Sequence, residues 1–342
     1  MKPASSINRS LAHTGYQLIE WLGPRLRLRT AFRLAEHLAD IQWRRSPRVR
    51  EAVETNLSRL LEIAVPDQVA IGQEVFRNFA RYLVEFFAIQ RAELPALDIE
   101  GRAHLEQCRA DAHGAILLTG HLGNWELGAA CIRRLGLPVT VVALPHADPR
   151  TDRLFTRQRQ RCGLNAIPLG AQVVGRCLRS LKAGNLLGMP GDWDVTGAGL
   201  PVPFGSGSLV MPRGPAVLSL RSGAPVLPVF LIREGRWAFR LFVEPPIWPD
   251  GDQTGEAVVR SLTRRYADVL ERYVRRFPEQ WLVFHEAVVP LRYQSGPEWA
   301  SLPGLPTAPV WAMVGRPRTT AGAVSDLDNG NHGTVLRSHP GR

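Results

Sequence analysis

Cysteine and lysine are both scarce in this sequence of 342 residues. Its four cysteines are Cys108, Cys131, Cys162 and Cys177. They form no CxxC pair and no cluster with histidine at zinc-site spacing, so neither a zinc module nor a disulfide framework is expected. Reduced, buried thiols fit a chain of this size. Lysine occurs only at Lys2 and Lys182, so nearly all of the positive charge is arginine.

Long apolar runs are also absent. No uninterrupted apolar segment reaches the roughly 18–20 residues that a membrane-spanning helix needs. The best window, residues 215–232, contains Arg221 and three prolines. Lys2 and Arg9 are not followed by an apolar stretch, so no cleaved signal peptide is expected. A spanning or secreted protein is therefore disfavoured, which leaves a soluble protein or one that lies on a membrane surface.

Positive charge exceeds negative charge, and the excess is concentrated near the N-terminus. Lys and Arg total 42 against 31 Asp and Glu, a net charge of +11, and residues 1–60 alone hold 11 basic and five acidic residues. Such a segment suggests nucleic acid or an anionic membrane surface as partner. Residues 11–42 predict two helices, separated at Gly23-Pro24, with apolar side chains on one face and arginines opposite. These helices could lie in a lipid interface, or pack on the domain with a solvated basic face.

The remaining sequence changes its pattern twice. Residues 49–91 predict two more helices, the second with an aromatic stripe that is typical of core packing. From residue 98, strand patterns alternate with helix patterns, which predicts an α/β sandwich around a mixed, mainly parallel sheet. After about residue 292 the sequence is rich in Pro, Gly, Ser and Thr, as in a disordered tail. The expected organisation is a membrane-associating helical segment (1–95), an α/β core (96–292) and a tail (293–342).

The main candidate catalytic residues lie in the segment Gly120-His121-Leu122-Gly123-Asn124-Trp125-Glu126. It follows a predicted strand and opens a predicted helix, so His121 lies where α/β folds place ligand chemistry. Glu126, in the first helical turn, can fold back to the imidazole, where a carboxylate fixes the tautomer and supports the imidazolium. The other ring nitrogen could then take a proton from a hydroxyl. The alternative is a loop histidine, with Glu126 stabilising the helix N-terminus.

A second polar group follows another predicted strand at Asp192 and Asp194. Two carboxylates at this spacing could bind a metal, hold an arginine or receive sugar hydroxyls. No histidine or third acid lies nearby, so pairing with an arginine is favoured over a metal, with Arg159 as the candidate. The sequence has no G-x-S-x-G nucleophile, which favours transfer by His121 without a covalent enzyme intermediate.

Two further segments carry weaker signals. Arg213 precedes a predicted helix and could bind a phosphate at its N-terminus, although Pro near a helix start is also a capping feature. Residues 278–285 predict a final buried strand, in which His285 is interpreted as a hydrogen-bonded structural residue.

Four blocks occur in an order that points to one family. They read GHLGNWELGA (120–129), GDWD (191–194), PRGPAVLSLRSGAPVLPV (212–229) and PEQWLVFH (278–285). With them the sequence resembles the lipid A biosynthesis acyltransferases, the lauroyl and myristoyl transferases, and the related phosphatidylinositol mannoside acyltransferases. The resemblance covers roughly residues 10–290. Residues 199–205 depart from the mannoside-type pattern because they lack its acidic residue.

The resemblance implies a fold like that of glycerol-phosphate acyltransferases and a catalytic H-x4-D/E pair, which His121 and Glu126 would form. It also implies a location at the cytoplasmic face of the inner membrane, where we expect peripheral or weak attachment. Residues expected to bind substrate are Asn124, Arg159 (or, in the alternative register, Arg157), Asp192, Asp194 and Arg213.

We therefore expect an O-acyltransferase that moves a fatty acyl group from acyl carrier protein or coenzyme A to a hydroxyl of a membrane glycolipid. Backbone N–H groups of the His121 turn, helped by Arg159, would stabilise the oxyanion. No cofactor or metal is expected beyond the acyl thioester. The expected partners are the glycolipid, the thioester carrier and an anionic membrane surface. Alternatives are a thioesterase or lysophospholipid hydrolase on the same scaffold, and a nucleic-acid-binding protein, for which no motif is present.

Overall fold

The computed structural model describes residues 6–22, 25–89, 96–110, 114–250 and 255–290. The first 89 residues contain helices α1 (Ser6–Leu22), α2 (Leu28–Arg45), α3 (Pro47–Leu60) and α4 (Val65–Ala88). The four predicted N-terminal helices are thus confirmed. The predicted tail, residues 293–342, lies outside the described residues. No helix in the described ranges combines the length and the apolarity needed to cross a bilayer.

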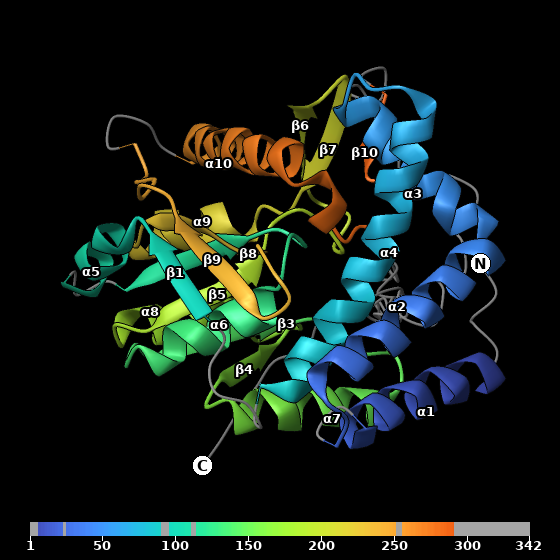
Figure 1. The fold of residues 1–342 in the computed structure, drawn as a ribbon. Coiled ribbons are helices and arrows are strands. Elements are labelled where there is room, and N and C mark those ends of the chain that lie inside the picture. The colour runs from blue at the N-terminus through green and yellow to red at the C-terminus, as the bar shows by residue number, and fades with distance from the viewer. Residues whose placement is uncertain (1–5, 23–24, 90–95, 111–113, 251–254, 291–342) are drawn as a thin grey trace, which may run out of the picture.

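A seven-stranded sheet forms the centre of the molecule (Figure 1). Its strands in spatial order are β1 (Ala96–Glu100), β9 (Ala238–Val243), β8 (Val226–Arg233), β2 (Ala115–Thr119), β5 (Leu186–Pro190), β3 (Val139–Ala143) and β4 (Asn165–Pro168). Strands β8 to β4 in this order are parallel, whereas β1 and β9 are parallel to each other and antiparallel to the rest. The predicted mixed, mainly parallel sheet is confirmed.

Helices cover both faces of this sheet. They are α5 (Arg102–Ala110), α6 (Trp125–Arg134), α7 (Pro149–Arg161), α8 (Val173–Lys182), α9 (Gly214–Ser222) and α10 (Glu256–Arg276). Because side chains alternate along a strand, β2 sends Ile116 and Leu118 into the core beside α8, α9 and α10, and Ala115 and Leu117 into the core beside α5 and α6. All five residues of β2 are buried, as a central parallel strand requires.

The helices α1 to α4 gather at one end of the sheet (Figure 1). Aromatic side chains of α4 join this helical part to the α/β core. Phe86 and Phe87 contact Phe155 of α7, with ring centroids 5.6 Å apart in each pair. Phe76 and Phe79 contact Phe284 near the C-terminal end of the described chain. The predicted reading of the aromatic stripe as core packing is confirmed.

Two local features differ from the sequence prediction. A small antiparallel sheet of β6 (Leu200–Phe204), β7 (Gly207–Met211) and β10 (Val288–Val289) is present but was not predicted. The predicted strand at 278–285 is wrong, because this segment begins with the 3-10 helix η1 (Pro278–Gln280) and continues without a strand. Residues 280–284 are buried, but Gln280 and Leu282 hydrogen-bond to the loop after β2 instead of to a sheet neighbour.

Candidate active site

His121 and Asp192 meet at the carboxyl ends of two neighbouring parallel strands. His121 lies two residues beyond β2, and Asp192 lies two residues beyond β5, which pairs with β2. The His121 Nδ1 atom is 2.7 Å from Asp192 Oδ1, and the His121 backbone N–H donates to Oδ2, also at 2.7 Å. Parallel neighbours bring their carboxyl ends together, which is where α/β folds build sites. The two residues thus form a histidine–carboxylate pair.

The carboxylate of Asp192 is fully buried and held by three hydrogen bonds. Besides the two from His121, Trp281 Nε1 donates to Oδ2 at 3.0 Å. Burial by itself would raise the pKa of Asp192, but the charge interaction with His121 and these hydrogen bonds together hold it below the ordinary value. An ionised carboxylate only accepts hydrogen bonds, so His121 carries its proton on Nδ1. In the neutral imidazole, the Nε2 atom then has a free lone pair.

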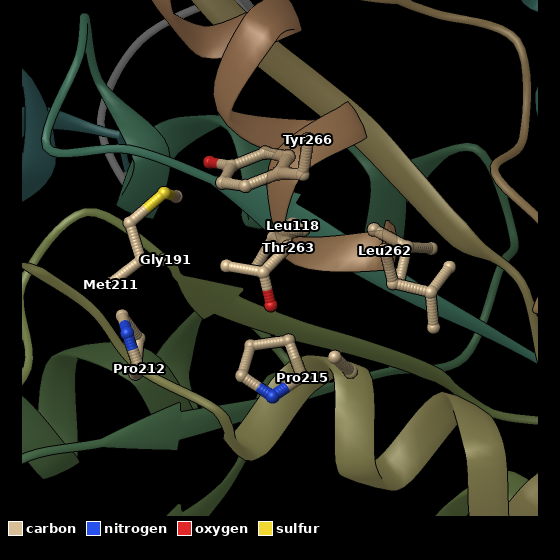
Figure 2. A pocket seen from close by; sticks show the side chains of 10 residues that line it. Leu118, Gly191, Met211, Pro212, Pro215, Leu262, Thr263 and Tyr266 are labelled. Atoms are coloured by element: carbon tan, nitrogen blue, oxygen red, sulfur yellow. The ribbon is translucent and has the colours of Figure 1, made fainter. Parts of the chain in front are cut away.

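The back wall of this pair is apolar. A narrow pocket between β2, β7, α9 and α10 is lined by Leu118, Gly191, Met211 and Tyr266, among others (Figure 2). The Tyr266 hydroxyl has no hydrogen-bond partner among the described residues. Burial, with a smaller contribution from Asp192, raises the pKa of Tyr266 well above its usual range, so the phenol is neutral. These surroundings keep water away from the inner side of the Asp192 carboxylate.

The loop that carries His121 is fixed from two sides. Leu282 N–H donates to the His121 carbonyl at 2.6 Å, and Gly123 N–H donates to the Gln280 carbonyl at 2.9 Å. Gly123 has a φ of +65°, and a Cβ there would lie 2.0 Å from the carbonyl oxygen of Leu231. Only glycine fits both the left-handed backbone and this close approach. The expected role of this turn in an oxyanion hole is not supported at three of its amides, because those of His121, Gly123 and Asn124 already donate to protein oxygens.

Glu126 does not contact His121, contrary to the sequence prediction. It pairs with Arg159 of α7, whose Nε lies 3.0 and 3.1 Å from the two carboxylate oxygens and whose Nη2 lies 2.5 Å from Oε1. Both side chains are buried. Burial alone would lower the pKa of Arg159, but Glu126 raises it, so the guanidinium stays charged. The predicted pairing of Arg159 with Asp192 is therefore wrong, and Asp192 takes the place beside His121 that was expected for Glu126.

The other predicted substrate-binding residues are engaged within the protein. Asn124 caps α6 by accepting a hydrogen bond from Leu127 N–H and donates to Glu85. Asp194 accepts hydrogen bonds from the backbone N–H groups of the turn that follows it. Arg213 pairs with Glu256 at the surface. Arg157, the alternative to Arg159, is exposed on α7. These contacts do not test substrate binding, which stays a prediction for these residues.

Aromatic rings surround the exposed side of His121, whose side chain is 23% exposed. Trp125 meets it edge to face, with ring centroids 4.9 Å apart, and Trp193 lies at 6.0 Å. The ring of His285 also contacts Trp193, with ring centroids 5.0 Å apart. The sequence analysis missed Trp281 and Trp193. Trp193 lies in the block GDWD and Trp281 in the block PEQWLVFH, and this position in the family blocks could have identified both as site residues.

A comparison with models of protein families shows to which family this chain belongs. A model of the family described as bacterial lipid A biosynthesis acyltransferase matches residues 6–288. The chain belongs to this family. Its match includes all four blocks on which the sequence resemblance rests, and His121, Asp192 and Trp281 all lie within it. As a member of the family, the protein is an acyltransferase.

Curated relatives of this lipid A acyltransferase family member agree on the class of reaction. A phosphatidylinositol mannoside acyltransferase of Mycobacterium tuberculosis (strain ATCC 25618 / H37Rv) is 29% identical over 248 residues, which cover 68% of this chain and 74% of the relative. Its namesake from Mycolicibacterium smegmatis is 26% identical over 245 residues, covering 68% and 77%. The departure at residues 199–205 thus does not prevent similarity to mannoside-type enzymes.

Proposed function

We propose that this protein transfers a fatty acyl group from an acyl thioester to a hydroxyl group of a membrane glycolipid, with His121 as the general base. The observation that carries the proposal is the His121–Asp192 pair at the carboxyl ends of β2 and β5 in a chain of an acyltransferase family. The buried carboxylate fixes the Nδ1–H tautomer. It therefore leaves the Nε2 lone pair available to a substrate hydroxyl.

In the proposed reaction, Nε2 takes the proton as the hydroxyl oxygen attacks the thioester carbonyl carbon. A carbon–oxygen bond forms, and Asp192 stabilises the imidazolium. When the tetrahedral intermediate collapses, the carbon–sulfur bond breaks and Nε2 returns its proton to the leaving thiolate. The products are an ester and a free thiol, and no cofactor or metal takes part. General-base catalysis of this kind contributes about 10²–10⁴-fold.

The family description and the relatives' names support the proposed acceptor, whereas the carrier is proposed because the acyl donor is a thioester. We propose acyl carrier protein or coenzyme A as the carrier. We propose a lipid A-type or phosphatidylinositol mannoside-type lipid as the acceptor, because the family description and the relatives' names point to these two groups. Both are glycolipids of the membrane, so the enzyme must reach headgroups at a lipid surface.

The face formed by α1 and α2 is suited to that surface. Leu18 and Trp21 on α1 are 51% and 55% exposed, and Leu34 and Leu38 on α2 are 43% and 54% exposed. Four arginines in and before α2 are exposed as well: Arg25, Arg27, Arg29 and Arg33. Arg25 lies over the Trp21 ring at 4.7 Å. Apolar side chains among arginines match the boundary between acyl chains and anionic headgroups. We propose that this face attaches the protein to the cytoplasmic leaflet of the inner membrane.

Activity measurements on His121→Ala test the catalytic proposal. We expect the rate of acyl transfer from palmitoyl-CoA or palmitoyl-acyl carrier protein to fall by about 10²–10⁴-fold. The variant should still fold, because the backbone N–H of residue 121 and Trp281 Nε1 still donate to Asp192. Loss of the imidazole hydrogen bond to this buried carboxylate should lower the free energy of unfolding by about 1–3 kcal/mol. Full activity in this variant would end the proposal. Release of free fatty acid at the same rate with and without acceptor lipid would favour a hydrolase instead.

Flotation with vesicles tests the membrane face. Trp21→Ala should weaken binding to vesicles that contain anionic phosphatidylglycerol by several-fold, and added salt should weaken it further. The matched control is Trp248→Ala, because Trp248 is also partly exposed (37%) but follows β9. Equal binding of both variants, or indifference to lipid charge, would contradict the proposal.

A further inference from the structure

His285 lies one aromatic ring away from the His121–Asp192 pair. Trp193 contacts both histidines, with its ring centroid 6.0 Å from that of His121 and 5.0 Å from that of His285. His121 and Asp192 both influence the pKa of His285. His285 is only partly exposed. His285 is thus a neighbour of the pair, in contact with an aromatic side chain that also contacts His121.

The backbone around His285 is held in place by other residues. Its carbonyl accepts a hydrogen bond from Asn56 Nδ2 at 2.7 Å. The Asn56 Oδ1 atom in turn accepts from the N–H groups of Ala287 and Val288, at 2.9 and 3.1 Å. The preceding side chain, Phe284, is buried against α4. The position of the imidazole thus follows from its neighbours and requires no hydrogen bond of the ring itself.

The ring of His285 makes no hydrogen bond to any residue in the described ranges, although sequence analysis interpreted it as hydrogen-bonded. Burial, reinforced by the nearby His121, lowers the pKa of His285 to about 4. At neutral pH the ring is therefore uncharged, with one nitrogen that donates and one that accepts. A polar ring that is mostly withdrawn from water and lacks a protein partner has unused hydrogen-bonding capacity.

We infer that His285 binds a second hydroxyl of the acceptor headgroup while His121 takes the proton from the reacting hydroxyl. A hydroxyl both donates and accepts, which matches a neutral imidazole, whereas a phosphate would call for a cationic side chain. The inference rests on the proposed function and narrows it. The acceptor is a polyhydroxylated, sugar-type headgroup, in which two hydroxyls lie on one rigid framework. His285 is thus a positioning residue for the acceptor.

Steady-state kinetics of His285→Ala test this inference, with palmitoyl-CoA as donor and phosphatidylinositol mannoside as acceptor. Loss of one neutral hydrogen bond should raise the KM for the acceptor by roughly three- to tenfold. The KM for the donor and kcat should stay within about twofold. His285→Asn keeps a donor and an acceptor atom, so it should restore part of the affinity. His104→Ala, at a partly exposed histidine of α5, is the matched control and should resemble wild type.

A series of singly deoxygenated acceptors makes the test specific. Wild type should lose affinity for the acceptor that lacks the hydroxyl bound by His285, whereas His285→Ala should not discriminate against it. An unchanged acceptor KM, a loss confined to kcat, or equal discrimination in both proteins would overturn the inference and leave the proposed function intact. If wild type acylates no acceptor, the proposed function fails and the inference fails with it.

Discussion

Replacing Asp192 with asparagine should invert the tautomer of His121. Two donors, the His121 backbone N–H and Trp281 Nε1–H, converge on the Oδ2 position of this side chain. In Asp192→Asn the amide oxygen will take that position, because an NH₂ group there would face both donors. Leaving such buried donors unpaired costs about 1–3 kcal/mol each. The amide NH₂ must then face His121 Nδ1, which becomes an acceptor. The proton moves to Nε2, and the general base is lost.

The expected magnitude is a fall in kcat of about 10³–10⁴-fold, which is most of what a positioned base contributes. The free energy of unfolding should change only slightly, because two of the three hydrogen bonds to this side chain survive. The assay is acyl transfer from palmitoyl-CoA to a glycolipid acceptor, with chemical denaturation in parallel. Glu126→Gln is the comparison variant, because Glu126 contacts Arg159 and not the imidazole. If Asp192→Asn kept more than a tenth of the activity, the argument from the tautomer would be refuted.

The remaining predictions concern stability. Glu126→Ala should cost about 3–5 kcal/mol in denaturant unfolding, because it leaves a buried guanidinium unpaired, and a change below 1 kcal/mol would contradict this. Gly123→Ala should be more destabilising than Gly136→Ala in thermal unfolding, since both have positive φ but only Gly123 meets a backbone atom. In the folded protein, burial lowers the pKa of His146 and of His285 to about 4, below the ordinary value of 6.5 that applies to the unfolded chain. As pH falls below 6.5, the unfolded state therefore binds protons before the folded state does. The free energy of unfolding should therefore decrease between pH 6.5 and 4, by up to about 3 kcal/mol per histidine, and His285→Asn should flatten that slope.

The sequence was most informative where patterns are local. Strand and helix periodicities from residue 96 onward predicted the α/β core, and the glycines around His121 indicated a tight turn at a strand end. The carboxylate that contacts His121 could not be assigned from spacing alone. Glu126 is close in sequence, but it is the second residue of α6 and pairs with Arg159 of α7. Asp192 is 71 residues away in sequence, and only the pairing of β5 with β2 brings it to the imidazole.

The segment around Trp281 shows a second limit of sequence reasoning. Its short run of apolar residues predicted a buried strand. A buried segment without strand pairing has the same kind of run, so the sequence alone does not distinguish the two. In the structure the segment crosses the loop after β2, where Leu282 and Gln280 hydrogen-bond to the backbone of that loop. The small sheet of β6 and β7 was missed because Pro201 and Pro203 weaken the strand pattern. Both prolines are exposed, and among the described strands β6 pairs with β7 alone, as an edge strand.

The pairing of β1 with β9 has a consequence for biosynthesis. β1 is the first strand in the described part of the chain, yet its sheet neighbour β9 begins at Ala238. During synthesis, β1 leaves the ribosome more than a hundred residues before β9 does. The pairing of β1 with β9 therefore forms late, through contacts between residues far apart in the sequence. The contacts of Trp281 and Leu282 with Asp192 and His121 form later still. A nascent chain released before residue 281 would therefore lack two contacts that hold Asp192 and His121 in place, so the site is complete only when the α/β region is nearly complete.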